Sequence, residues 1–173
     1  MRRLLIIFLV CIYPLTGYGQ EQESFNITGG IGIPELINIG GRFQINQTEL
    51  GFSAGTLPSA DEEVFSLQAN LLYHFGGSTA FSTRRPWYIR SSFTYSRSDT
   101  ESELAKYLFL DLRIGRDLNF SDNFGVQIDI GPAYVISEDI TEKKAKENTW
   151  FLFDIDLDQK VLPIVGITFF YRI

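Results

Sequence analysis

The chain has little of what many functions require. Its 173 residues include one cysteine, Cys11, and one histidine, His74. The formal net charge is −6 and no basic cluster stands out, so we do not expect a nucleic-acid partner. The longest apolar run is too short for a bilayer-spanning helix, which argues against a helical membrane protein. A hydrophobic content of 45% with 21% charged residues excludes a disordered chain.

The N-terminal segment, residues 1–19, has the features of a secretory signal peptide. Two arginines precede an apolar run, and Gly17 and Gly19 have the spacing of small residues that a signal peptidase needs. We therefore predict a mature domain of residues 20–173 that contains no cysteine and hence no disulfide.

Apolar and polar residues alternate along most of this mature domain. Residues 37–46 and 165–173 are two of eight such segments, counting a weaker first one at 25–33. A period of two indicates β-strands with one apolar and one polar face. Each segment has about ten residues, the length with which a tilted strand crosses a bilayer. The predicted fold is all-β, an eight-stranded antiparallel up-and-down transmembrane β-barrel.

The polar face decides between a membrane barrel and a soluble one. Charged residues stand in the middle of the predicted strands on this face, together with many glycines. In a narrow barrel these charges could pack only as paired, hydrogen-bonded groups. We therefore predict a luminal charge network that consists of Arg42, Glu49, His74, Arg90, Asp111, Arg113, Asp117, Asp129 and Arg172. A soluble, secreted lipocalin-like carrier, with its apolar face inward, is an alternative.

Aromatic residues make up 14% of the chain, and those of the apolar face gather near the strand ends. Aromatic belts at both membrane interfaces are typical of lipid-facing barrel surfaces. The residues predicted to form them are Tyr73, Phe75, Trp87, Tyr95, Phe124, Tyr134 and Tyr171. The alternative is that these rings fill a soluble core.

The C-terminal segment carries a resemblance to a known class of proteins. Every second residue is apolar in the series Val165, Ile167, Phe169, Tyr171 and Ile173. This series resembles the terminal assembly signal of Gram-negative outer-membrane β-barrels, although Ile173 stands where these proteins usually end in Phe. With the signal peptide and eight strands, the chain resembles the small OmpA/OmpX-like barrels. The resemblance implies location in the outer membrane and insertion by the barrel assembly machinery.

Two features invite a chemical interpretation. His74 could belong to a lipid-modifying outer-membrane enzyme, with Ser78 in the following turn, but no acid or oxyanion site is marked for a triad. The carboxylates of segment 154–158 could bind a cation, but Gln159 and Val165 stand where an EF-hand loop needs Gly and Glu. We predict no catalytic residue, no cofactor and no metal site, and interpret segment 154–158 as a continuation of the last strand.

The loop from Ser137 to Lys160 is the most plausible interaction surface, because it combines mixed charge with Trp150, Phe151 and Phe153. Anchoring of the barrel rim in the membrane is an equally good interpretation of these rings. We expect an integral outer-membrane barrel with a structural or surface-interaction role and no open pore. Its expected partners are outer-membrane lipid and lipopolysaccharide, while the partner of the loop is not identified by the sequence.

Overall fold

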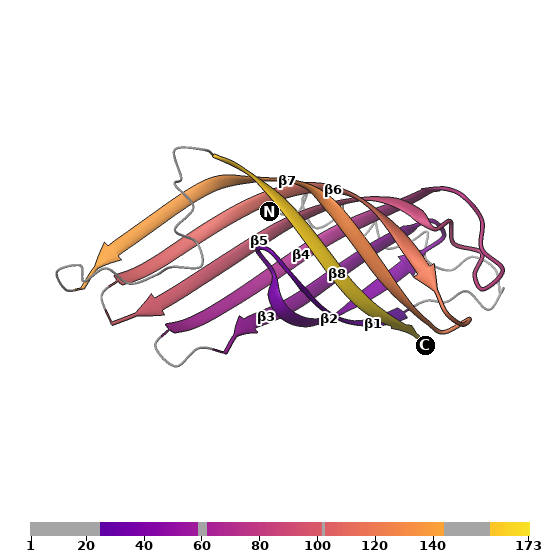
Figure 1. The fold of residues 1–173 in the computed structure, drawn as a ribbon, viewed down its shortest axis with the longest axis horizontal. Coiled ribbons are helices and arrows are strands. Elements are labelled where there is room, and N and C mark those ends of the chain that lie inside the picture. Colours follow the sequence, from indigo (N-terminus) through magenta and orange to yellow (C-terminus); the bar gives the residue numbers. More distant parts are fainter. Residues whose placement is uncertain (1–24, 59–61, 102, 144–159) are drawn as a thin grey trace, which may run out of the picture.

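The computed structural model describes residues 25–58, 62–101, 103–143 and 160–173, which form a closed barrel of eight antiparallel strands (Figure 1). The predicted signal peptide and segment 154–158 lie outside the described residues. The strands are β1 (Phe25–Gly32), β2 (Leu36–Ile45), β3 (Thr48–Leu57), β4 (Glu62–Gly76), β5 (Trp87–Thr100), β6 (Glu103–Asn119), β7 (Phe124–Glu142) and β8 (Val161–Arg172). Each strand pairs with the next, and β1 pairs with β8 to close the barrel. The predicted fold class is confirmed.

The wall of the barrel is uneven in height. We call the end that holds Phe25 and Arg172 the inner end, and the end that holds Glu35 the outer end. Strand β1 has 8 residues, whereas β7 has 19, so β4 to β7 extend past the other strands at the outer end. The sequence predicted about ten residues per strand because Glu63, Arg97 and Lys106 end the apolar alternation on the outward faces of β4 to β6. The predicted loop from Ser137 to Lys160 therefore begins as strand, since residues 137–142 belong to β7, and residues 144–159 lie outside the described ones.

The polarity of the barrel is the reverse of that of a soluble protein. Along β8, exposed and buried side chains alternate without interruption, with the odd-numbered ones exposed. The exposed positions of β8 include Phe169. Apolar side chains on other strands are exposed to a similar or greater extent, with Ile39 68% exposed and Ile130 61% exposed. The opposite face of the sheet, which lines the interior, is largely polar and charged, and its side chains are buried. Within the described chain, no helix is long and apolar enough to cross a membrane.

Two turns fold into the interior and place charged side chains there. Between β1 and β2, the turn of residues 33–35 leaves Glu35 only 3% exposed, and its carbonyl oxygen accepts a hydrogen bond of 2.9 Å from the Ser66 hydroxyl. At the inner end, the turn of residues 77–86 begins at Gly77, which has a φ of +80° that favours glycine, and buries Arg84. Both turns thus reduce the space inside the barrel.

The outer part of the interior differs from the rest because it is apolar along β6 to β8. The buried side chains there form one cluster that consists of Ala105, Tyr107, Phe109, Ala133, Val135, Leu162 and Ile164. The sequence analysis did not predict this cluster, which lies at the outer end of the face that was predicted to be polar. The ionic part of the interior therefore lies between this apolar cluster and the inner end.

Candidate functional site

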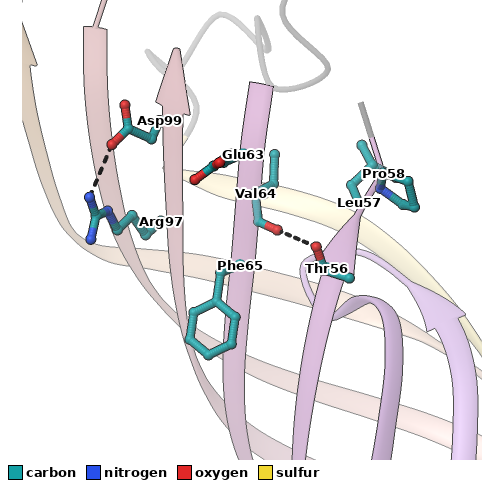
Figure 2. Close-up of a pocket in the computed structure, with 8 residues that line it drawn as sticks. All are labelled: Thr56, Leu57, Pro58, Glu63, Val64, Phe65, Arg97 and Asp99. Atoms are coloured by element: carbon teal, nitrogen blue, oxygen red, sulfur yellow. Dashed lines mark hydrogen bonds and ion pairs between the residues drawn. The ribbon is translucent and has the colours of Figure 1, made fainter. Parts of the chain in front are cut away.

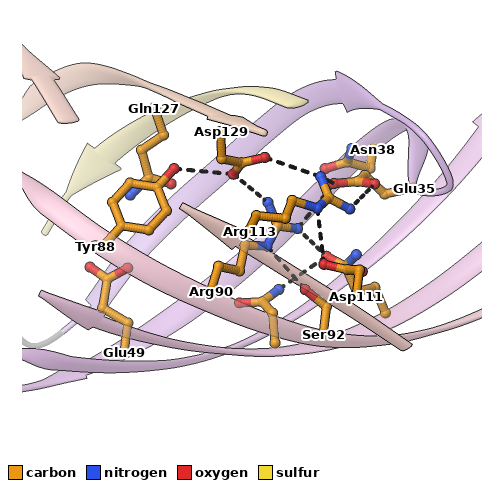
Figure 3. A network of polar contacts seen from close by, with 12 residues as sticks. Glu35, Asn38, Glu49, Tyr88, Arg90, Ser92, Asp111, Arg113, Gln127 and Asp129 are labelled. Atoms are coloured by element: carbon orange, nitrogen blue, oxygen red, sulfur yellow. Dashed lines mark hydrogen bonds and ion pairs between the residues drawn. The ribbon is translucent and has the colours of Figure 1, made fainter. Parts of the chain in front are cut away.

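Five charged residues from three strands and one turn form the outer part of the luminal charge network (Figure 3). Arg113 of β6 lies at its centre and donates two hydrogen bonds, of 2.7 and 2.8 Å, to the two carboxylate oxygens of Glu35. Its Nε donates a hydrogen bond of 2.9 Å to Asp111. Its Nη1, which also binds Glu35, donates one of 3.1 Å to Asp129. Arg90 of β5 binds Glu35 at 3.1 Å and Asp129 at 3.0 Å. The two arginines and the three carboxylates thus form one connected set of ion pairs inside the barrel.

Neutral groups complete this part of the network. The amide oxygen of Gln68 accepts a hydrogen bond of 2.5 Å from Arg90, and the hydroxyl of Ser92 accepts one of 3.1 Å. Tyr88 donates its hydroxyl hydrogen to Asp129 at 3.1 Å. Since buried charges are stable only when paired and hydrogen-bonded, these contacts account for the presence of so many ions in the interior.

A second cluster lies toward the inner end, around Glu49 of β3. Arg84, from the turn between β4 and β5, binds Glu49 and reaches Asp117 of β6 at 2.7 Å. The guanidinium of Arg42 is 3.6 Å from Glu49, and the side-chain amide of Asn26 donates a hydrogen bond of 2.8 Å to the same carboxylate. Arg84 also lies over the ring of Phe170, 5.1 Å from its centroid. The turn therefore closes the inner end with a cation held by two carboxylates.

His74 belongs to this second cluster. Its side chain is fully buried, with Nδ1 2.7 Å from the carbonyl oxygen of Arg85, so that Nδ1 acts as the donor. Its Nε2 is 3.9 Å from Glu49, and its ring lies 5.3 Å from the ring of Tyr88. This geometry fits a structural histidine that ties the turn to the wall, since the ring has no exposed atom to offer to a substrate.

The structure thus places each residue of the predicted network. All nine are buried inside the barrel, with relative exposures of 3% or less. Eight of them lie in the two clusters, while Arg172 contacts the turn between β6 and β7, donating to the carbonyl oxygen of Asp122 at 2.8 Å and to Asn119. Among the described residues, no group of three His, Cys, Asp or Glu side chains could hold a metal ion.

Sequence reasoning missed two members of the network, Glu35 and Arg84. Both lie in turns, where a charged side chain is normally solvated, and neither continues the alternation of a strand. The predicted set was already balanced, with four arginines and four carboxylates, so charge counting gave no sign of further members. Only the inward folding of the two turns reveals them.

The predicted aromatic belt residues all point away from the interior. Their exposed fractions range from 37% for Tyr95 to 54% for Tyr73. Trp87 lies at the inner end of β5, where the guanidinium of Arg116 is 5.3 Å from the ring centroid. Of the predicted assembly signal, every residue is likewise on the outer surface, from Val165 to Ile173.

Comparison with known proteins supports the fold. No protein-family model matches the chain, and no curated protein sequence is significantly similar to it. Among solved structures, the N-terminal β-barrel domain of Pseudomonas aeruginosa OprF aligns with a TM-score of 0.53 and 14% identity, covering 89% of this chain and 100% of that one. Acinetobacter baumannii CarO aligns with a TM-score of 0.47 and 12% identity, covering 88% of this chain and 98% of that one. The predicted resemblance is thereby confirmed at the level of the fold, and the chain has the closed eight-stranded antiparallel barrel of the OprF N-terminal domain.

Proposed function

We propose that this chain is an integral β-barrel of the outer membrane with a structural or surface-interaction role and no open pore. The observation that carries the proposal is the reversed polarity of the wall, with apolar side chains outside and paired charges inside. In water, such an outer surface would be an aggregation liability, since soluble monomers rarely expose large continuous apolar patches. In a bilayer the same surface is solvated by hydrocarbon.

The extent of the apolar surface supports this proposal. On β8 the outward residues are apolar from Val161 to Tyr171. A strand rises about 3.3 Å per residue, and a tilt of about 40° reduces the height of these ten steps to about 25 Å. This is the height of the apolar band of outer-membrane barrels. The belt residues Trp87 and Tyr171 lie at the inner end of the band, and Tyr95 and Tyr134 toward its outer end.

The interior supports the absence of an open pore. An eight-stranded barrel leaves room only for side chains, and here Arg90, Arg113 and Arg84 occupy it together with their carboxylate partners. We expect the purified protein to give no ohmic current steps in a planar lipid bilayer, measured beside a porin as the conducting control. Steady single-channel steps from the pure chain would contradict the closed interior.

The decisive test of the orientation is cysteine labelling along β8. Variants of a Cys11→Ser background would carry a single cysteine at Ile167 or Phe169, which point outward, or at Thr168 or Phe170, which point inward. In lipid vesicles, a lipid-soluble paramagnetic agent should speed the relaxation of a spin label at the two outward sites. It should have little effect on a spin label at the inward sites. The reverse pattern, or recovery of the protein in soluble form after osmotic shock, would contradict the proposal and favour a lipocalin-like carrier.

The proposal extends to biogenesis and to the absence of catalysis. The alternating apolar residues that end at Ile173 would serve as the signal for the barrel assembly machinery, and outer-membrane lipid and lipopolysaccharide would surround the wall. We propose no enzymatic activity, because His74 is enclosed by the charge network. Lipid A masses should therefore be the same with and without expression of the protein. A mass change that His74→Ala abolishes would overturn this part of the proposal.

A further inference from the structure

A cavity of about 480 Å³ lies at the outer ends of β3, β4 and β5 (Figure 2). This volume is in the range of sites that hold small organic ligands. Four of the lining residues are apolar, namely Leu57, Pro58, Val64 and Phe65. Val64 is buried and lies opposite Leu57 in the β3–β4 register, whereas Phe65 points outward and is exposed. The cavity therefore offers an apolar wall to the body of a ligand.

The polar side chains of the lining are mainly hydrogen-bond acceptors. Glu63 is exposed and lies opposite Asp99 in the β4–β5 register. The hydroxyl of Thr56 already donates to the carbonyl oxygen of Val64 at 2.8 Å, so its oxygen remains as an acceptor. The cation of the lining is the guanidinium of Arg97, which donates to Asp99 at 3.0 Å. The cavity thus combines two carboxylates with one cation that is already bound.

The two carboxylates of the cavity differ in their partners. Asp99 accepts hydrogen bonds from both Lys143 and Arg97. These bonds lower the pKa of Asp99, so that its carboxylate is ionised at neutral pH. Within the described part of the chain, no cation forms an ion pair with Glu63. Like charges that are directly opposite on neighbouring strands repel each other, and a cation bound to Glu63 would remove this repulsion.

The rim around the cavity also carries an excess of negative charge. Its described cations, at the outer ends of β5 to β7, are Arg97, Lys106 and Lys143. The described carboxylates of the same region are those of Asp99, Glu101, Glu103, Glu138, Asp139 and Glu142. A surface of one dominant sign raises the local concentration of counter-ions and lowers that of ions of its own sign. The rim therefore favours a cationic ligand over an anionic one.

We propose that this cavity binds a small organic cation, a protonated amine with an apolar body. The ammonium group donates charge-assisted hydrogen bonds to Glu63, which are the strong ones, and a further bond to the hydroxyl oxygen of Thr56. The apolar body packs against Leu57, Pro58 and Phe65, which removes apolar surface from water. The inference goes beyond the proposed function, which assigns no small ligand, and it does not depend on where the barrel is located.

The test compares three probes of equal chain length that differ in charge: hexylammonium, hexanol and hexanoate. Each probe is titrated into the isotope-labelled full chain in a zwitterionic detergent at neutral pH, and NMR follows the amide signals at the outer ends of β4 and β5. We expect saturable binding of hexylammonium, with affinities for the other two probes about tenfold lower or less. Glu63→Gln should lower the affinity for hexylammonium about tenfold. Arg97→Gln should raise this affinity, because it removes a cation from the lining.

The matched control is Glu142→Gln, which removes the same charge from the rim but not from the lining of the cavity. Its affinity for hexylammonium should stay close to that of the wild type. Phe65→Ala should weaken the binding of hexylammonium more than that of methylammonium, and heat-modifiable migration on gels should show that every variant forms a barrel. Equal binding of hexylammonium and hexanol by the wild type, or equal losses in Glu63→Gln and Glu142→Gln, would refute the site. Either result would leave the proposed function intact, since labelling along β8 tests that function separately.

Discussion

The ionic interior depends on a few residues that each bind several partners. Arg113 forms ion pairs with three carboxylates, those of Glu35, Asp111 and Asp129. When a buried ion loses its partner, the remaining charge is left without compensation, which is why single removals in such networks are strongly destabilising. The consequences of substitution should therefore differ sharply between the interior and the rim.

Substitution of Arg113 tests this difference. We expect Arg113→Gln to lower the free energy of unfolding by about 3–5 kcal/mol, since three carboxylates lose their common cation. The measurement is urea unfolding in lipid vesicles, followed by tryptophan fluorescence. As the control, Arg97→Gln should leave the free energy of unfolding almost unchanged, because its ion pair is exposed to solvent and screened. Similar losses in both variants would show that burial does not govern the strength of these contacts.

A second prediction at this scale concerns a close approach inside the barrel. A Cβ atom at Gly55 would collide with the backbone carbonyl oxygen of Glu35 and approach the hydroxyl of Ser66 to 2.6 Å. Gly55→Ala should therefore push the Glu35 turn out of place and destabilise the protein by about 1–3 kcal/mol. In the control Gly29→Ala, the new Cβ would be 3.7 Å from its nearest neighbour, an ordinary contact. Urea unfolding of the two variants side by side would contradict the prediction if Gly29→Ala were the more damaging.

At the scale of elements, strands and turns were not equally predictable. Alternation located the eight strands because lipid and lumen impose opposite polarity on successive side chains. It also placed four arginines, four carboxylates and His74 in the interior, since an even spacing from any luminal residue stays luminal. It could not give the strand ends at β5 to β7, where charged and polar residues end the apolar alternation of the outward face, nor the two turns that fold inward, since a turn has no periodicity.

Two prolines, on β7 and β8, show how far a local irregularity in the hydrogen bonds between strands can be predicted. Proline lacks the N–H that a ladder hydrogen bond needs, so Pro132 and Pro163 predict a local irregularity on their strands. In the structure they are opposite each other in the β7–β8 register without a shift. On its other side, β7 shows the irregularity: the β6–β7 register passes from the pair Asp111 and Ala133 to the pair Ile114 and Ile130, so Pro132 has no partner on β6. The prediction therefore holds for the β6–β7 ladder and not for the β7–β8 ladder, because the sequence does not reveal which neighbouring strand a proline will disturb.

The turn between β4 and β5 yields a prediction that separates two neighbouring arginines. Arg84 is buried and bound to Glu49 and Asp117, whereas Arg85 is exposed and donates to the carbonyl oxygen of Phe75 at 2.9 Å. We expect Arg84→Gln to lower the free energy of unfolding by about 3–5 kcal/mol and to increase hydrogen exchange in the turn. Arg85→Gln should have a small effect on both measurements. If the two variants behaved alike, the turn would not be held in place by its buried cation.

For the whole molecule, one pattern governs fold, location and solubility. The outer surface of the barrel carries large apolar side chains on all eight strands, and many of the charged side chains of these strands are enclosed in the interior. If the chain is an outer-membrane barrel as proposed, its folded state is most stable where hydrocarbon surrounds the wall. The height of the apolar band should then decide which bilayers suit the protein best.

This argument leads to a prediction about bilayer thickness. In a series of phosphatidylcholine vesicles with acyl chains of increasing length, the free energy of unfolding should be highest where the hydrocarbon core is about 25 Å thick, and should decrease in thicker bilayers. The decrease arises because a thicker core would reach Arg97 and Lys106, which limit the band on β5 and β6. The double variant Arg97→Leu, Lys106→Leu extends the band by one outward pair, so its optimum should move to a thicker bilayer. An optimum that is the same for the wild type and the double variant would show that this pair does not mark the edge of the hydrocarbon.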